Sequence, residues 1–206
     1  MRTLFRPPSL DDLIRLLKAW RFWVLGALLG ALVGIIVFYV APPPYRARAT
    51  VNVDFNMEDA WPDIADRQQF YYLERETRKL EEIAWSDDVL RAVVDECGSV
   101  TVEDLREGKL ILSQPREAGW HFFAEDQDPE RAALLASAWA RAFVKRVEIA
   151  IAAESGMDAF IRAEATQVAN VPARRSNPLG AYMISGALGL LFISALALLF
   201  IDFERK

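Results

Sequence analysis

The stretch FWVLGALLGALVGIIVFYVA, Phe22 to Ala41, contains no charged residue. A helix of this length spans the ~30 Å hydrocarbon core of a bilayer at a rise of about 1.5 Å per residue. A second uncharged run, LGAYMISGALGLLFISALALLFI, extends from Leu179 to Ile201. Helices in the core of a soluble protein rarely stay uncharged for so long. The sequence therefore predicts two transmembrane helices, at 22–41 and 179–201.

The first run could also be read as a cleaved signal peptide. It is longer than a normal signal-peptide apolar region, and no small-x-small cleavage site follows it, because Tyr39 precedes Val40 and Ala41. We therefore expect both helices to remain in the protein.

The composition agrees with a membrane protein that carries a polar middle segment. The 206 residues are 53% hydrophobic and 26% charged, which is possible because the apolar residues are concentrated in the two runs. The net charge of −5 argues against nucleic acid as a partner. A single cysteine, Cys97, excludes an intramolecular disulfide and a cysteine-cluster zinc site, and a single histidine, His121, excludes a multi-histidine metal site.

The flanking charges predict the topology. Residues 1–21 carry five basic and two acidic side chains and read as a basic amphipathic helix at the membrane surface, while Arg205 and Lys206 end the short tail 202–206. The positive-inside rule then places both termini in the cytoplasm. The middle segment, 42–178, has 17 basic and 25 acidic side chains, a net charge of −8, and is expected outside the cytoplasm.

Small residues recur at four-residue spacing in both runs and form our candidate helix-packing interface. They are Gly26, Gly30 and Gly34 in the first run and Ala181, Ser185 and Gly189 in the second. Such spacing lets helix backbones approach closely, within one protomer or between protomers. Glycine and alanine are also simply common in membrane helices. Neither run holds an ionisable side chain, which argues against a transporter.

The middle segment reads as a small α+β domain. After the proline-containing membrane exit Pro42, Pro43, Pro44 and Tyr45, the pattern predicts the following elements in order: a strand at 45–55, a helix at 63–86, a helix from Ser86 to Gly98, a short helix starting at Thr101, strands at 109–113 and 120–124, a helix from Asp128 to about Ala153, broken at Gly156, and a strand at 166–171. The charged stretch ERETRKLEE, Glu74 to Glu82, reads as a solvated helix face. The long helix from Asp128 carries an apolar stripe that includes Trp139, Phe143 and Ile151.

Residues with catalytic spacing are not apparent. Acidic pairs such as Asp87 with Asp88 fit helix N-termini better than general acid–base catalysis. His121 lies in an alternating strand, Cys97 is expected to be a buried small residue, and there is no phosphate-binding glycine loop or metal-ligand spacing. We therefore expect no cofactor and no enzymatic activity, which also disfavours a membrane-anchored hydrolase.

The order of the motifs resembles the chain-length determinant (Wzz-type) family, the polysaccharide co-polymerases. A basic stub, DLIRLLKAWRFWVL, leads into the first helix, and APPPYRARATV (Ala41–Val51) is similar to the family's membrane exit. The middle, from Thr101 to Phe143, resembles the family's helix–strand–strand–"D-x-D-P-x-x-A" region. ANVPARRSNPLGAY (Ala169–Tyr182) resembles its proline-rich approach to the second helix, with Pro172, Asn177 and Pro178 matching and Arg175 standing near where another proline is often found.

The resemblance implies a non-enzymatic, homo-oligomeric scaffold in the bacterial inner membrane. Such a scaffold contacts membrane lipid and a polysaccharide polymerase or glycan chain, and sets the length of an O-antigen, capsule or exopolysaccharide. The chain leaves only about Lys145 to Ala165 for the long helical hairpin of typical members, which fits the short members that act as adaptors. The alternative is therefore an adaptor that activates a cytoplasmic tyrosine kinase, although the five-residue tail offers such a kinase little surface.

Overall fold

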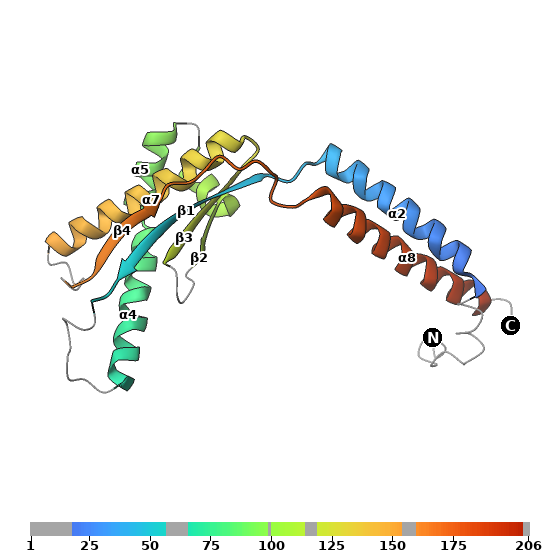
Figure 1. The fold of residues 1–206 in the computed structure, drawn as a ribbon, viewed down its shortest axis with the longest axis horizontal. Helices are drawn as coiled ribbons and strands as arrows, with labels where there is room; N and C mark the ends of the chain where they lie inside the picture. The colour runs from blue at the N-terminus through green and yellow to red at the C-terminus, as the bar shows by residue number, and fades with distance from the viewer. Residues whose placement is uncertain (1–17, 57–65, 99, 114–118, 154–159, 204–206) are drawn as a thin grey trace. The chain divides into compact units, whose positions relative to one another are not determined.

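The computed structural model describes residues 18–56, 66–98, 100–113, 119–153 and 160–203 (Figure 1). The chain divides into two compact units. One contains residues 1–43 and 177–206, and the other contains residues 44–176.

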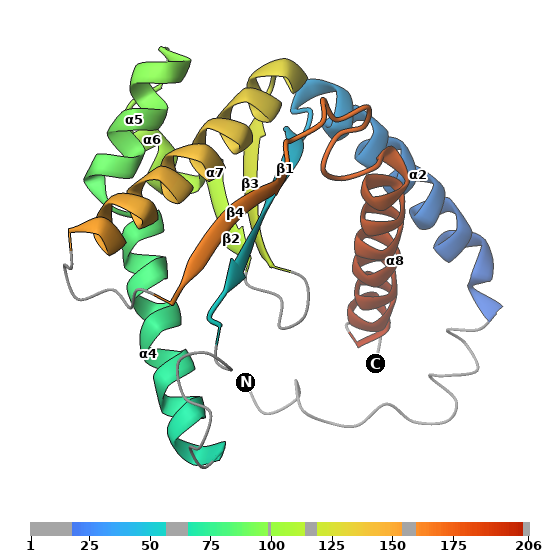
Figure 2. The same ribbon diagram turned by 60° about the vertical axis from the view of Figure 1, so that its left-hand side comes forward.

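The first unit is a pair of apolar helices, α2 (Trp20–Val40) and α8 (Leu179–Phe203), which lie side by side (Figures 1 and 2). Helix α2 and the Leu179–Ala197 part of α8 are both long and apolar enough to cross a membrane. The helices differ slightly from the predicted ones: α2 starts two residues earlier, and α8 continues through Asp202 to Phe203, so the predicted tail 202–206 begins inside the helix. Most of the predicted amphipathic segment 1–21 lies outside the described residues.

The second unit is a mixed α/β domain built on a four-stranded antiparallel sheet. Its strands are β1 (Tyr45–Asp54), β2 (Leu110–Ser113), β3 (Trp120–Asp126) and β4 (Arg162–Gln167), in the order β2-β3-β1-β4. The mixed α/β class is thus as predicted. Strand β1 lies between β3 and β4, and on the β3 side Ala49 is opposite Phe122 and Val51 is opposite Trp120.

One face of this sheet is covered by helix α7 (Pro129–Ala152), as Figures 1 and 2 both show. Trp139 and Phe143 of α7 are fully buried, and their rings lie 4.8 Å and 5.1 Å from the ring of Phe122. Helices α4 (Asp66–Ala84) and α5 (Asp87–Cys97) pack against α7 in turn, and the indole N–H of Trp139 donates a 2.8 Å hydrogen bond to the carbonyl of Ala84. Ile151, predicted at the end of the apolar stripe, is only half-buried.

The local signals at the helix ends are confirmed. Ser86 caps α5 by accepting from the Val89 N–H, and Gly98 ends this helix in the left-handed conformation, with φ of 72°. Thr101 and Asp104 form a capping box on the short helix α6 (Val102–Asp104), which continues into the π-helical turn η1 (Leu105–Lys109). At the start of α7, Asp128 is the N-cap and Pro129 takes the first helical position. The predicted break at Gly156 lies outside the described residues.

Two predictions for this domain are wrong. The last strand is β4 at 162–167 and not 166–171, because the apolar residues Val168 and Val171 are exposed and follow the strand instead of pairing in it. The stretch Glu74–Glu82 is not wholly solvated: Glu76 is fully buried, because it lies one turn from the buried Leu80 on the inner face of α4. Its Oε1 lies 2.9 Å from both Arg75 Nε and Lys79 Nζ.

Candidate functional site

The structure brings the three predicted glycines of α2 directly against α8. Gly26, Gly30 and Gly34 are the buried residues of α2. A Cβ built on Gly30 would lie 2.9 Å from the Cα of Ala187 and still closer to the carbonyl of Gly186, and one on Gly34 would lie 2.7 Å from the carbonyl carbon of Tyr182. Carbon atoms in contact normally stay about 3.5–4.0 Å apart, so glycine is required for this approach.

The α8 side of this interface is formed by residues one position beyond the predicted ones. Tyr182, Gly186, Leu190 and Ser194 face the glycines of α2 at four-residue spacing. The predicted residues Ala181, Ser185 and Gly189 are exposed, and a Cβ on Gly189 would meet no atom within 4 Å. Because α8 is apolar all round, its sequence carries no periodic signal that distinguishes these adjacent faces.

Two side-chain interactions complete the face of α8 that contacts α2. The hydroxyl of Ser194 donates a 2.7 Å hydrogen bond to the carbonyl of Leu190, so this polar group is satisfied within its own helix. The rings of Phe38 and Tyr182 meet edge to face, with centroids 5.5 Å apart. Aromatic pairs of this geometry are favourable beyond their buried area.

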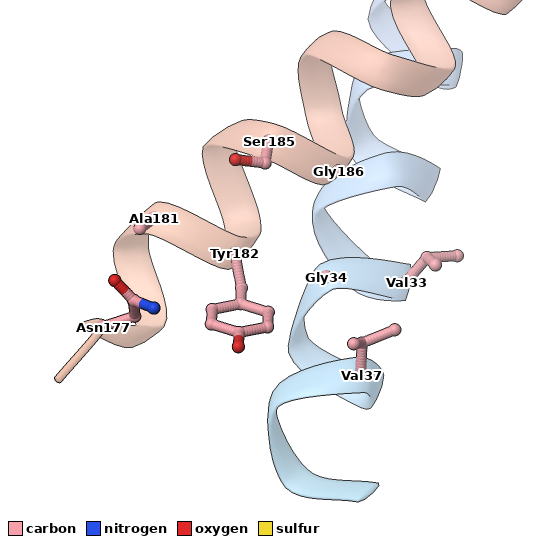
Figure 3. Close-up of a pocket in the computed structure, with 8 residues that line it drawn as sticks. All are labelled: Val33, Gly34, Val37, Asn177, Ala181, Tyr182, Ser185 and Gly186. Carbon is pink, nitrogen blue, oxygen red and sulfur yellow. The ribbon is translucent and has the colours of Figure 1, made fainter. Parts of the chain in front are cut away.

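A groove of about 530 Å³ lies beside the closest approach of the helices. Gly34 and Gly186 line it together with the side chains of Val33 and Val37 on α2 and those of Ala181 and Ser185 on α8, which Figure 3 shows. Two of the predicted small residues, Ala181 and Ser185, therefore line this groove, whereas a Cβ on Gly189 would meet no atom within 4 Å.

The predicted proline-containing segments lie where the chain passes between the two units. Helix α2 ends at Val40, Pro42 to Pro44 follow, and Tyr45 is the first residue of β1. At the other end, Pro172 is half-buried, Asn177 is exposed, and Pro178 immediately precedes α8, where its carbonyl accepts a 3.0 Å hydrogen bond from Ala181 N–H.

The first and last residues of the α/β domain are bonded to each other. The N–H of Ser176 donates a 2.9 Å hydrogen bond to the carbonyl of Pro44, and Tyr45 pairs with Arg175 in an antiparallel bridge. The guanidinium of Arg175 lies 4.7 Å from the centroid of the Tyr45 ring. The sequence drew attention to Arg175 only as a departure from a proline pattern, and its contact with Tyr45 could not be predicted from it.

The titratable groups of the domain have structural surroundings. Burial lowers the pKa of His121, the charge of Arg48 lowers it further, and Nδ1 of this histidine lies 3.2 Å from the hydroxyl of Thr50. Burial alone raises the pKa of Asp126, but hydrogen bonds from the Asp128 N–H and the Lys109 ammonium, together with the charges of Arg131 and Lys109, outweigh it, so this pKa lies below its usual value.

Cys97 is half-buried, whereas the sequence predicted a buried residue. Burial, and secondly the charge of Glu96, raise the pKa of its thiol, which favours the unreactive protonated form. In the described part of the chain, no group of three or more His, Cys, Asp or Glu side chains could hold a metal ion.

The sequence matches no protein-family model. It also matches no curated protein. A function for this chain therefore has to be inferred from its geometry and its sequence motifs.

Proposed function

We propose that this chain is a non-enzymatic, oligomeric scaffold of the bacterial inner membrane that regulates chain length in surface polysaccharide biosynthesis. Both termini face the cytoplasm in this proposal, and the α/β domain lies outside it. The partners are further copies of the chain, membrane lipid, and a polysaccharide polymerase or the growing glycan.

The observation that carries the proposal is the way the chain is organised around its two apolar helices. Glycines on α2 fit against the α8 backbone, and the first and last parts of the intervening domain are bonded to each other through Pro44, Tyr45, Arg175 and Ser176. Such a chain carries a folded domain in the sequence between two closely packed helices. This arrangement suits a protein that acts by assembling and positioning others.

The nature of the helices supports a scaffold over a conduit. Between Phe22 and Val40, and between Leu179 and Ile201, there is no Asp, Glu, Lys, Arg or His. Proton relays and ion pathways across membranes usually depend on such side chains. The ordered motifs that resemble the polysaccharide co-polymerases, from APPPYRARATV to NPLGAY, add the polysaccharide context.

The test is a gene deletion in the source bacterium, with the surface polysaccharide resolved by size on a gel. We expect a changed length distribution with the total polymer largely kept. Complementation with Gly30→Leu, which introduces a large side chain where Gly186 approaches, should fail to restore the distribution. Complementation with Gly189→Leu is the matched control, because a side chain there enters open space.

The alternative, an adaptor for a cytoplasmic tyrosine kinase, gives a different result in the same strains. Unchanged polymer length, together with lost tyrosine phosphorylation of a partner or lost export, would replace the chain-length proposal by the adaptor. Unchanged polymer length, phosphorylation and export would remove both functions.

A further inference from the structure

Arginines gather at both ends of the α/β domain, against the overall charge of this segment. Residues 42–178 carry a net charge of −8, yet Arg46 and Arg48 follow the first apolar run and Arg174 and Arg175 precede the second. The positive-inside rule describes the opposite bias for residues close to a span on the translocated side. These arginines therefore call for an explanation other than topology.

The first two arginines lie on the face of the sheet that α7 does not cover. In β1, Ala47 and Ala49 are buried under α7, and alternation along the strand directs the exposed Arg46 and Arg48 to the opposite face. Arg46 Nε donates a 2.6 Å hydrogen bond to Glu125, its register partner on β3. Arg48 stands opposite Phe123 and, in the described part of the chain, makes no ion pair.

A third arginine joins them through the bridge that closes the domain. Tyr45 pairs with Arg175, whose Nη1 also lies 3.3 Å from Gln127 Oε1. Arg174, the residue before it, is exposed and has no ion pair with any residue that the structure describes. Residues paired in an antiparallel bridge share a face of the sheet, so Arg175 lies on the face of Tyr45, whereas Arg174 is brought beside Arg46.

Few acids offset this positive charge. Glu125 neutralises one arginine. The adjacent Asp126 is buried and already has Lys109 Nζ at 3.3 Å and Arg131 Nη2 at 3.9 Å. The patch formed by Arg46, Arg48 and Arg174, which we call the arginine patch, therefore keeps an excess of positive charge.

Chain connectivity keeps the arginine patch close to any membrane that the helices cross. Arg46 is six residues beyond Val40, the end of α2, so their Cα atoms lie within about 20 Å even if the chain is fully extended. Tyr39 and Tyr182 stand at the corresponding ends of α2 and α8. Tyrosine is enriched where a span meets the headgroup region, so these residues indicate where the membrane surface lies along the helices.

We infer that the arginine patch binds the phosphate groups of anionic membrane lipids at the surface from which the α/β domain projects. The planar guanidinium group matches phosphate with two parallel hydrogen bonds, and basic residues near a membrane attract anionic headgroups. This inference is independent of the polysaccharide proposal. It requires only that α2 and α8 cross a membrane.

The test is native mass spectrometry of the full chain in detergent, titrated with phosphatidylglycerol and, separately, with zwitterionic phosphatidylcholine. We expect phosphatidylglycerol to bind more tightly, and the double variant R46Q/R48Q to bind it about 30-fold more weakly, from the usual contribution of a basic residue near an anionic surface. The variant R141Q/R146Q is the matched control. It removes the same charge from two arginines of α7, the exposed Arg141 and the half-buried Arg146, each of which pairs with an acid.

Several outcomes would overturn the inference. Equal weakening in both double variants would indicate a general charge effect, and unchanged binding in R46Q/R48Q would place the lipid elsewhere. Displacement of phosphatidylglycerol by millimolar inorganic phosphate would identify a free-phosphate site and not a lipid site. The variant R46K/R48K keeps the charge but loses the paired guanidinium hydrogen bonds, so it should bind phosphatidylglycerol more weakly than the unaltered chain and more tightly than R46Q/R48Q. If it binds as weakly as R46Q/R48Q, charge does not cause the loss.

Discussion

Replacing Gly30 by alanine should weaken the α2–α8 pair, although alanine is the better helix former. The added methyl would lie 2.6 Å from the carbonyl carbon of Gly186 and still closer to its oxygen, whereas carbon atoms in contact rest about 3.5–4.0 Å apart. The helices must therefore separate by at least about 0.9–1.4 Å at this point. A gap of that size forfeits about half or more of the dispersion energy of each affected contact, including those at Gly26 and Gly34.

The expected cost follows from these distances. Overpacking of a well-fitted interface typically costs about 1–3 kcal/mol, and we expect Gly30→Ala to fall in this range and Gly30→Leu to exceed it. Gly189→Ala adds the same methyl to the other helix, where no atom lies within 4 Å. This control should be neutral or stabilising by up to about 1 kcal/mol, the usual gain in helix propensity.

The assay is unfolding of the full-length protein from a mild detergent by sodium dodecyl sulfate, followed by circular dichroism. Gly30→Ala should lower the midpoint, and Gly189→Ala should leave it unchanged or raise it. Equal midpoints for the two variants would refute the assignment of the Gly26–Gly30–Gly34 face to the contact with α8.

Three further predictions concern the α/β domain. Trp139→Ala should destabilise the domain by about 3–5 kcal/mol, because it empties a fully buried site and leaves the Ala84 carbonyl without its donor; thermal unfolding of the full chain measures this. Ser86→Ala removes the N-cap of α5 and should cost about 0.5–1 kcal/mol in the same experiment, at the low end because the capping bond is 3.5 Å long. The pKa of His121 is lowered in the folded state, so its contribution to stability is complete above pH ~6.5 and is lost as the pH falls through the folded-state pKa. His121→Gln should therefore reduce the dependence of the melting temperature on pH between pH ~7 and ~5. An unchanged dependence would contradict this.

Local signals in the sequence predicted most of the elements, because each depends on neighbouring residues. The cap at Ser86 and the stop at Gly98 fix α5 within one residue, and Asp128 with Pro129 fixes the start of α7. Strand β4 was misplaced because an edge strand has a neighbour on one side only. Five of its six residues are exposed, so it shows no apolar alternation, and the valines beyond it gave a misleading signal.

The candidate interface was predicted on one helix and missed on the other for a physical reason. On α2, the glycines stand out because they recur at that spacing among large apolar residues. On α8, adjacent residues are rotated by about 100°, and Ser185 and Gly186 are both small, so the side that meets α2 depends on the tertiary fit. The sheet order and the closure by Arg175 likewise join residues far apart in the chain and have no local signal.

The central position of β1 has a consequence for the synthesis of the protein. Of the four strands, β1 leaves the ribosome first, and its neighbours β3 (Trp120–Asp126) and β4 (Arg162–Gln167) are made much later. At about 5–20 residues per second, β1 waits roughly 5–25 s for its second neighbour. During this time, the edges of β1 and the apolar residues Ala49 and Val51 are uncovered. A nascent chain of this design depends on chaperones, or on the translocation machinery, to keep that strand from pairing with a neighbouring copy.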